Sequence, residues 1–363
     1  MLAANQRASR TNPCPACGGT DKCLTYLSDL PNACFCCNPP EHLKTSHNER
    51  FSQQFGRAFW IISYNQVGGE PIPADTPNTT PPNSCWDGYQ KAYRDLHARL
   101  HLSPFWKEHL LKRGFTAEEI EKRGYRSIPY SPTDIVEPLY LLYKQEWQRI
   151  PGFVFSSSSP TILGEGCLLI PIRDINGEIR AFQLRNRDGK NPKYRWFSHD
   201  SLLSTPIHHN PSSSTDLFLT EGPLKADYLS YKIGARILSY QGVNSLACLP
   251  LELEKIKGVT RAFIANDADG WYDTARRLAT AKAHMTASSV SAGTWRTLQI
   301  LQRTDWLVRV LKWEVSITDG IVRPKGIDDW LRGKTTLLSL SPIEYQNLIK
   351  QEDPALAYTL GFG

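Results

Sequence analysis

Residues 216–234 read DLFLTEGPLKADYLSYKIG, and this stretch decides the fold of the later part of the chain. Its apolar start predicts a β-strand that ends at Glu221, and the remainder predicts a helix that ends at Gly234. A related pattern, TRAFIANDADG at 260–270, predicts a second apolar strand that runs into Asp267. A carboxylate at the end of a buried strand is unfavourable unless a cation arrives. The two stretches therefore predict a cation site where the strands end.

Strands and helices alternate over the whole region from 216 to 316. The further strands are expected at 235–242, 260–267 and 306–316, and the further helices at 249–258 and 271–287. Such alternation predicts a parallel, Rossmann-like sheet with helices on its faces. Ligands of these sheets bind at the carboxyl ends of the strands. We therefore expect the carboxylates at the strand ends to share one edge.

Five carboxylates are candidates for that edge: Glu221, Asp267, Asp269, Asp328 and Asp329. Ligand sets made only of oxygen suit Mg²⁺ or Mn²⁺, which also bind phosphate oxygens. For any single acid the alternative is a helix cap or a solvated turn. This alternative is strongest for Asp269, because Asp-Gly is a common turn.

The Glu-Gly at the end of one strand and the Asp-x-Asp at the end of another resemble the Toprim domain. That domain is shared by bacterial-type primases, topoisomerases and some nucleases. The resemblance implies that Glu221, Asp267 and Asp269 hold catalytic magnesium or manganese, and that Asp328 is a further catalytic acid.

The stretch GCLLIPIRDINGEIRAFQLRNRDGKNPKYRWFSHDS, at 166–201, resembles the basic half of the catalytic core of bacterial and phage primases. Between 173 and 195, seven Lys or Arg and three Asp or Glu give a local net charge of 7 − 3 = +4. The resemblance implies that Arg185 and Lys193 contact phosphates of the template or nucleotide. A solvated polar hairpin is the alternative for this stretch.

Six of the nine cysteines lie between positions 14 and 37. Two Cys-x-x-Cys units, Cys14/Cys17 and Cys34/Cys37, are spaced for one tetrahedral structural zinc site. Reduced cysteines or a disulfide are the alternatives, Cys36 is a rival for Cys37, and Cys23 lies outside the expected first shell. The block resembles the zinc ribbon of phage primase-helicases and bacterial primases.

The order of these segments resembles a bacterial-type primase. The expected fold is α/β, with a small β zinc ribbon followed by a primase core that has a mixed α+β basic subdomain and a Toprim sheet. The expected divisions are a zinc ribbon domain (1–70), a linker (71–84), a helical segment that opens the core (85–135), the basic subdomain (136–210), the Toprim domain (211–335) and a C-terminal helical tail (336–363). The compact size is typical of a primase of a plasmid, phage or other mobile element.

The sequence departs from this pattern at two places. Replicative primases usually carry an Asp four residues after the Toprim Glu, whereas this chain has Lys225. Lys225 would either take the place of one metal as a fixed cation or contact a phosphate. The third alternative is that its presence means weak or absent polymerase activity. The adjacent pair Asp328-Asp329 replaces a spaced pair, so we expect only one of them to reach the metals. No GxxxxGK[ST] phosphate loop occurs.

These features predict a DNA primase that synthesises short RNA primers on single-stranded DNA from nucleoside triphosphates. A separate replicative helicase is a conceivable partner. The alternatives are a Toprim nuclease, which would lack the basic half, and a catalytically weak or inactive DNA-binding protein. The net charge of +6 is compatible with a polyanionic partner. The sequence has no apolar run long enough to span a membrane, and its start lacks the apolar stretch of an export signal. A cytoplasmic protein is therefore expected.

Overall fold

The computed structural model describes residues 89–363 apart from 157, 189–191, 199–205, 243–245, 334 and 363, together with short strands in the first 88 residues. The chain divides into two compact units, Met1–Asn83 and Ser84–Gly363. The predicted linker, 71–84, lies outside the described residues.

The first unit contains an antiparallel sheet. Its described strands are β1 (Gln6–Arg7), β2 (Leu24–Tyr26), β3 (Ala33–Cys36), β4 (Glu49–Ser52) and β5 (Arg57–Ser63), in the order β1-β2-β3-β5-β4. The strand β5 comes from the apolar stretch RAFWIIS. Cys36 at the end of β3 is buried. The described residues of this unit therefore form a β-sheet, and the zinc ribbon predicted for it stays a prediction.

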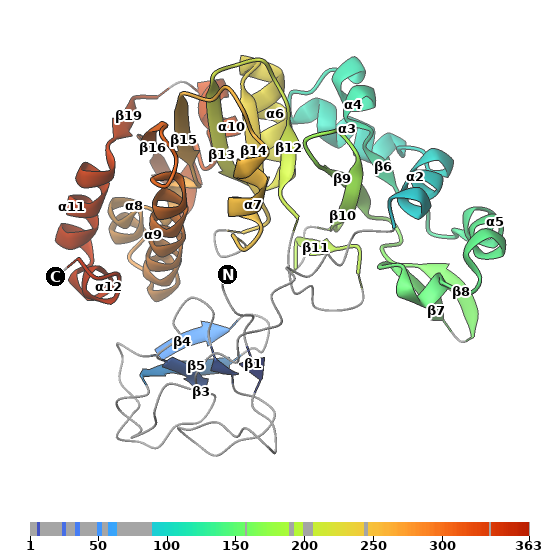
Figure 1. The fold of residues 1–363 in the computed structure, drawn as a ribbon, viewed down its shortest axis with the longest axis horizontal. Coiled ribbons are helices and arrows are strands. Elements are labelled where there is room, and N and C mark those ends of the chain that lie inside the picture. Colours follow the sequence, from blue (N-terminus) through green and yellow to red (C-terminus); the bar gives the residue numbers. More distant parts are fainter. Residues whose placement is uncertain are drawn as a thin grey trace. The chain divides into compact units, whose positions relative to one another are not determined.

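The second unit begins with helices and a small sheet (Figure 1). The helices are α2 (Gln90–Arg99), α3 (Pro104–Lys112), α4 (Ala117–Arg123) and α5 (Thr133–Tyr143). The helix α4 starts after Thr116, because the Thr116 hydroxyl accepts a hydrogen bond from the Glu119 amide at 3.2 Å. The small sheet has the order β11-β10-β9-β6, from β6 (Arg126–Ser127), β9 (Leu168–Arg173), β10 (Ile179–Arg185) and β11 (Tyr194–Trp196). A hairpin of β7 (Phe153–Ser156) and β8 (Ser159–Ile162) follows the short helix η2 (Trp147–Arg149).

A large sheet forms the rest of the second unit, with the strand order β12-β14-β13-β15-β16-β19. The strands are β12 (His208–Asn210), β13 (Asp216–Glu221), β14 (Arg236–Tyr240), β15 (Arg261–Ala265), β16 (Leu307–Trp313) and β19 (Leu337–Leu340). The inner strands β14, β13, β15 and β16 pair in parallel, as predicted, and β12 and β19 are antiparallel edges. The fold of this unit is therefore mixed α/β.

Helices between and after these strands cover the large sheet. They are α6 (Pro223–Ile233), α7 (Leu249–Glu254), η3 (Ala268–Gly270), α8 (Tyr272–Leu278), α9 (Ala281–Leu301), α10 (Ile327–Gly333), α11 (Pro342–Glu352) and α12 (Pro354–Thr359). The prediction of a single helix at 271–287 was wrong, because this stretch contains α8 and the start of α9. The chain breaks at Ala279, which has φ +52°, and α9 restarts with Thr280 accepting a hydrogen bond from the Ala283 amide at 3.1 Å.

The expected helical tail at 336–363 also differs from the structure. Its first residues form β19, which adds an edge strand to β16, before α11 and α12 begin. A hairpin of β17 (Ser316–Thr318) and β18 (Ile321–Arg323) lies between β16 and α10. Among the described residues, no helix is long and apolar enough to cross a membrane.

The two sheets of this unit meet at β12, which lies beside β9 (Figure 1). The helix α6 contributes to two cores. Ala226 and Leu229 pack in the core of the large sheet, whereas Leu224 and Tyr228 pack with Leu168 and Ile170 of the small sheet. The start of α6 is therefore held firmly where both sheets converge.

Candidate functional site

Glu221 and Asp267 lie at neighbouring strand ends. The register of β13 and β15 pairs Thr220 with Ala265, so Glu221 and the residues after Ala265 emerge at the same edge of the large sheet. Gly222 turns the chain into α6 with φ +85°, a backbone conformation that glycine adopts without strain. Its amide donates to the carbonyl of Tyr240, the last residue of β14, at 2.9 Å.

Asp328 approaches Asp267 at Gly326, which packs against both side chains. A Cβ atom added to Gly326 would lie 2.6 Å from Oδ1 of Asp328, 3.2 Å from Cδ of Lys225 and 3.4 Å from Oδ1 of Asp267. The chain therefore passes through this point only because residue 326 lacks a side chain. Asp328, rather than its neighbour Asp329, is the member of the acidic pair that faces Asp267.

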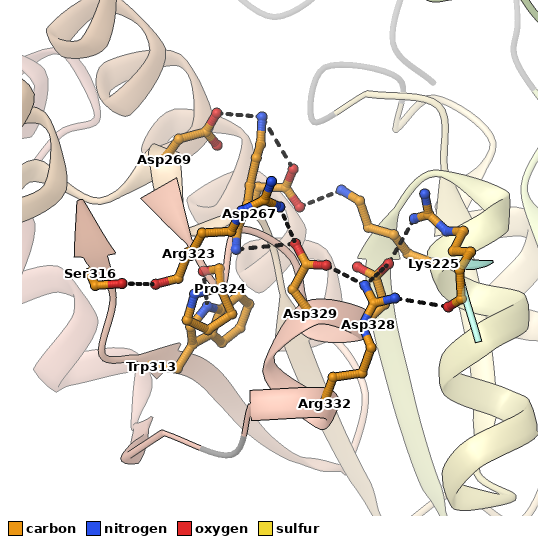
Figure 2. Close-up of polar contacts among 12 residues, drawn as sticks. Lys225, Asp267, Asp269, Trp313, Ser316, Arg323, Pro324, Asp328, Asp329 and Arg332 are labelled. Carbon is orange, nitrogen blue, oxygen red and sulfur yellow. Dashed lines mark hydrogen bonds and ion pairs between the residues drawn. The ribbon is translucent and has the colours of Figure 1, made fainter. Parts of the chain in front are cut away.

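Two lysines pair with the Asp-x-Asp carboxylates (Figure 2). The ammonium of Lys225 contacts Oδ1 of Asp267. The ammonium of Lys325 lies 2.7 Å from Oδ2 of Asp269 and 3.8 Å from Oδ2 of Asp267. We call Glu221, Asp267, Asp269 and Asp328 the carboxylate edge.

Two arginines hold the Asp328 carboxylate. Nη2 of Arg113 lies 2.7 Å from its Oδ2 atom, and Nη2 of Arg332 lies 3.7 Å from the same oxygen. Arg332 also contacts Asp329 and donates to the Arg113 carbonyl at 2.8 Å (Figure 2). Arg113 caps the end of α3, so the opening helical segment reaches the carboxylate edge. This role was not predicted for that segment.

The charges at this edge depend on one another. Burial raises the pKa of Glu221, and the neighbouring Asp267 and Asp269 carboxylates raise it further, while Lys225 opposes this effect. Burial alone would lower the pKa of Lys225, but the carboxylates of Asp267 and Glu221 outweigh it and raise that pKa. Lys225 therefore stays charged at neutral pH and belongs to the electrostatics of the site.

The carboxylate edge has the donor type that magnesium prefers. Nevertheless, within the described part of the chain no group of three or more His, Cys, Asp or Glu side chains is spaced as a ready metal site. Lys225 and Lys325 contact the Asp267 and Asp269 oxygens that a metal would use. The donors thus fit a divalent metal chemically, but ammonium groups already neutralise part of them.

Cations of the small sheet lie within electrostatic range of this edge. The pKa of Lys193 is lowered by partial burial and then by Arg185, Arg113, Lys325 and Lys225. Lys193 itself is exposed. Arg185 ends β10 and is mostly buried, with its guanidinium hydrogen-bonded to the Tyr194 hydroxyl. Lys193 is consequently the more accessible of the two predicted phosphate contacts.

His109 lies within electrostatic range of these cations. Burial and the charges of Arg185 and Arg113 lower the pKa of His109 to about 4. Its buried Nε2 atom has no hydrogen-bond partner within the described residues. His109 is therefore neutral at pH 7, and we call the three charged side chains, Arg113, Arg185 and Lys193, the cation wall. It is an arrangement of like charges that an anion would stabilise.

The carboxylates of Asp227 and Asp174 make structural hydrogen bonds and are not part of the carboxylate edge. Residues two positions apart on an α-helix point about 200° apart, so Asp227 faces away from Lys225. Its carboxylate accepts hydrogen bonds from Tyr125 at 2.5 Å and Arg123 at 3.1 Å, and lies 3.0 Å from Nε2 of His208. Asp174 accepts from the Asn176 and Glu178 amides and so closes the turn before β10.

A cavity of about 610 Å³ opens beside Asp329, and its lining does not include the four residues of the carboxylate edge. Asp329, Arg332 and Arg323 line one part, and Glu314, Ser316 and Thr335 line another. Its size is within the range of small-molecule sites. The hydrogen bond from the Ser316 hydroxyl to the Arg323 carbonyl, at 3.2 Å, connects β17 to the end of β18 beside it (Figure 2).

The predicted zinc site falls mostly outside the described residues. Cys14, Cys17 and Cys37 are among those not described, and Cys34 is described only as part of the β3 backbone, opposite Ile62 of β5. The zinc site remains a prediction from the spacing of the cysteines.

Comparisons with solved structures return primase domains, all at low identity. The chain is 14% identical to a DnaG primase catalytic domain bound to ssDNA, over 75% of this chain and 81% of that chain, with a TM-score of 0.47. It is 16% identical to the RNA polymerase domain of Mycobacterium tuberculosis primase DnaG, over 74% and 89%, with a TM-score of 0.46. For the zinc-binding and RNA polymerase domains of Aquifex aeolicus primase, the identity is 17% over 77% and 67%, with a TM-score of 0.45. No protein-family description matches the chain, and no curated protein matches it.

The sequence analysis did not identify three residues of the site: Arg113, Lys325 and Arg332. Lys325 directly precedes the Gly-Ile-Asp-Asp stretch, so its position beside an acidic motif was a usable signal. Arg332 lies four residues after Asp328 on α10, a spacing that favours an ion pair. Arg113 had no such local signal, because its partner lies in another domain-sized segment of the chain.

Proposed function

We propose that this protein is a primase-type nucleotidyltransferase that synthesises short RNA primers on a single-stranded DNA template. The observation that carries the proposal is that the cation wall meets the carboxylate edge: Arg113 lies 2.7 Å from the carboxylate of Asp328. Carboxylates that hold a metal, opposed by cations that hold phosphates, suit the joining of a nucleoside triphosphate to a hydroxyl group. The large sheet would be a Toprim domain.

The residues have distinct roles in this proposal. Glu221, Asp267 and Asp269 would hold magnesium or manganese, with Asp328 as a further acid oriented by Arg113. The bound metal would activate the attacking hydroxyl and neutralise charge on the leaving pyrophosphate. Lys193 and Arg185 would bind phosphates, with Arg185 positioned by Tyr194.

Primer synthesis tests the proposal directly. The full chain is incubated with single-stranded DNA of varied sequence, labelled ribonucleotides and Mg²⁺ or Mn²⁺. Short labelled products should form, and Asp267→Asn should abolish them. Asp216→Asn is the matched control, because Asp216 lies at the opposite end of β13 and pairs with Arg261 on the surface. An absence of products on every template would contradict primase activity.

A second candidate is a replication protein that binds DNA without catalysis. The ion pair between Lys225 and Asp267 favours this candidate, because it occupies an oxygen atom that a polymerase would use for metal. Under this function the protein binds single-stranded DNA tightly, without a metal requirement and without products. Nicking of DNA in the same assay would instead indicate a nuclease.

A further inference from the structure

The carboxylate edge already carries internal cations. Asp267 contacts Lys225 through Oδ1 and lies 3.8 Å from Lys325 through Oδ2, and Asp269 lies 2.7 Å from Lys325. Glu221 is the remaining acid next to this pair. No ion pair to Glu221 is found among the residues described in the structure. An ammonium group and a divalent metal repel strongly at such distances, so they would compete for the same oxygens.

Lys225 is held in place from several sides. It projects from the first turn of α6, where Leu224, Ala226 and Asp227 are all buried. Its stem packs against Gly326, where a Cβ atom would lie only 3.2 Å from Cδ of Lys225, and its side chain is only 20% exposed. Withdrawing this ammonium would leave Asp267 with an uncompensated charge in a largely buried site. Lys225 is therefore a fixed part of the edge.

Lys325 is held differently. Its backbone is anchored, because its carbonyl accepts from the Ala268 amide at 2.8 Å and its amide donates to Oδ2 of Asp329 at 3.3 Å. Its side chain, in contrast, is 48% exposed. A half-exposed lysine has free rotamers, so the ammonium can leave Asp269 while the backbone stays in place.

We propose that the two lysines divide the work of cations at this edge, an inference that rests on the proposed metal function. Lys225 is a permanent cation on Asp267, so the site takes one divalent metal and not two. Lys325 is an exchangeable cation that covers Asp269 and Asp267 until a metal arrives with a nucleoside triphosphate. It then leaves the carboxylates and pairs with the phosphates.

Manganese binding tests this inference without a need for activity. The zinc-loaded full chain is titrated with Mn²⁺, and the free Mn²⁺ is measured by electron paramagnetic resonance. The Mn²⁺ bound by Asp269→Asn is the background from other sites and is subtracted. We expect one site-specific ion on the wild type. Lys225→Met should bind two, and Lys325→Met should bind one with an affinity at least fivefold higher. Lys255→Met is the matched control, because Lys255 pairs with Glu252 on the surface and should change neither number.

Triphosphate binding supplies the second readout. With Mn²⁺ present, Lys325→Met should weaken the binding of a non-hydrolysable nucleoside triphosphate at least fivefold, and Lys325→Arg should restore it. If Lys225→Met does not fold, Lys325→Met still decides, since its side chain is on the surface. Two ions on the wild type, or an unchanged manganese affinity in Lys325→Met, would overturn the lysine inference but leave the metal site intact. An absence of site-specific manganese on every variant would overturn the metal site as well.

Discussion

The guanidinium of Arg113 lies 2.7 Å from the carboxylate of Asp328, a residue 215 positions later in the chain. Burial alone would lower the pKa of Arg113, but the Asp328 carboxylate raises it, so the arginine remains charged. The pair connects the opening helical segment to the carboxylate edge. That segment is therefore part of the site, although its sequence indicates only helices.

Replacing Arg113 tests this connection. Arg113→Met leaves Asp328 almost buried with only the more distant Arg332, so the free energy of unfolding should fall by about 3 kcal/mol. Urea denaturation measures the change. In a double-mutant cycle with Asp328→Asn, the two losses should be clearly non-additive. Additive losses would mean that the pair is not coupled in solution.

Gly326 should not tolerate any side chain. In Gly326→Ala the new methyl group would meet Oδ1 of Asp328 at 2.6 Å and displace a carboxylate that Arg113 holds. Since misplacement by about 1 Å costs roughly 100-fold in rate, primer synthesis should fall to that degree. The thermal unfolding midpoint should also fall, because the displaced carboxylate would lose its contact with Arg113, so rates are compared at a temperature at which both proteins are folded. Gly333→Ala is the control, because a Cβ at Gly333 meets nothing within 4 Å.

The buried Asp227 should make stability sensitive to acid. Burial would raise its pKa, but His208, Arg123 and Tyr125 outweigh this effect and lower it. Because the folded pKa lies below the unfolded value of about 3.9, the stabilisation is complete above that value and is lost as pH falls through the folded pKa. Asp227→Asn should lower stability by about 3 kcal/mol at pH 7. It should also flatten the pH dependence of unfolding below about pH 4. If Asp227→Asn shows the same pH dependence of unfolding below about pH 4 as the wild type, the prediction for Asp227 is wrong.

Lys193 should contribute to DNA affinity through phosphate contact. Lys193→Ala should weaken binding to single-stranded DNA equally for all sequences. The slope of log K against log salt should decrease in magnitude by about 0.7, the value for one phosphate contact on a single strand. Fluorescence anisotropy at several salt concentrations measures it. Lys91→Ala is a suitable control, because Lys91 is an exposed lysine on α2. An equal effect in both variants would assign the change to net charge alone.

The zinc prediction can be tested by metal analysis. One zinc per chain is expected, and Cys17→Ser should lose most of it, because four thiolates complete the tetrahedral site. Cys248→Ser, which lies in the second unit, should retain the metal. If Cys37→Ser keeps its zinc and Cys36→Ser loses it, then Cys36 is the fourth ligand.

Much of the large sheet could be predicted from sequence. The strands β13, β14, β15 and β16 are short apolar runs separated by helical stretches. This alternation is typical of a parallel sheet covered by helices. The two antiparallel edge strands were not predicted. β19 has three of its four residues exposed, so no buried face marks it. It pairs with β16, and a local sequence pattern does not reveal this pairing.

The break between α8 and α9 also lacked a signal. Ala279 takes φ +52° without being glycine or asparagine, the residues that normally indicate such a turn. At the site, the strand-end carboxylates were predicted because their positions follow from the sheet. Lys325 and Arg113 were missed because they depend on how separate elements pack. Charge alone does not tell which cation meets which acid.

His208 has a consequence for how the protein can move. Its Nδ1 atom accepts a hydrogen bond from the Arg173 amide of β9 at 3.0 Å, and its Nε2 atom lies 3.0 Å from Asp227 of α6. One buried imidazole thus links the small sheet to the helix α6 of the large sheet. The small sheet and α6 cannot move apart without breaking the hydrogen bonds of His208. Under the proposed function, a bound nucleotide would be accommodated by movement of the exposed side chains of Lys193 and Lys325 and not by a movement of the two sheets.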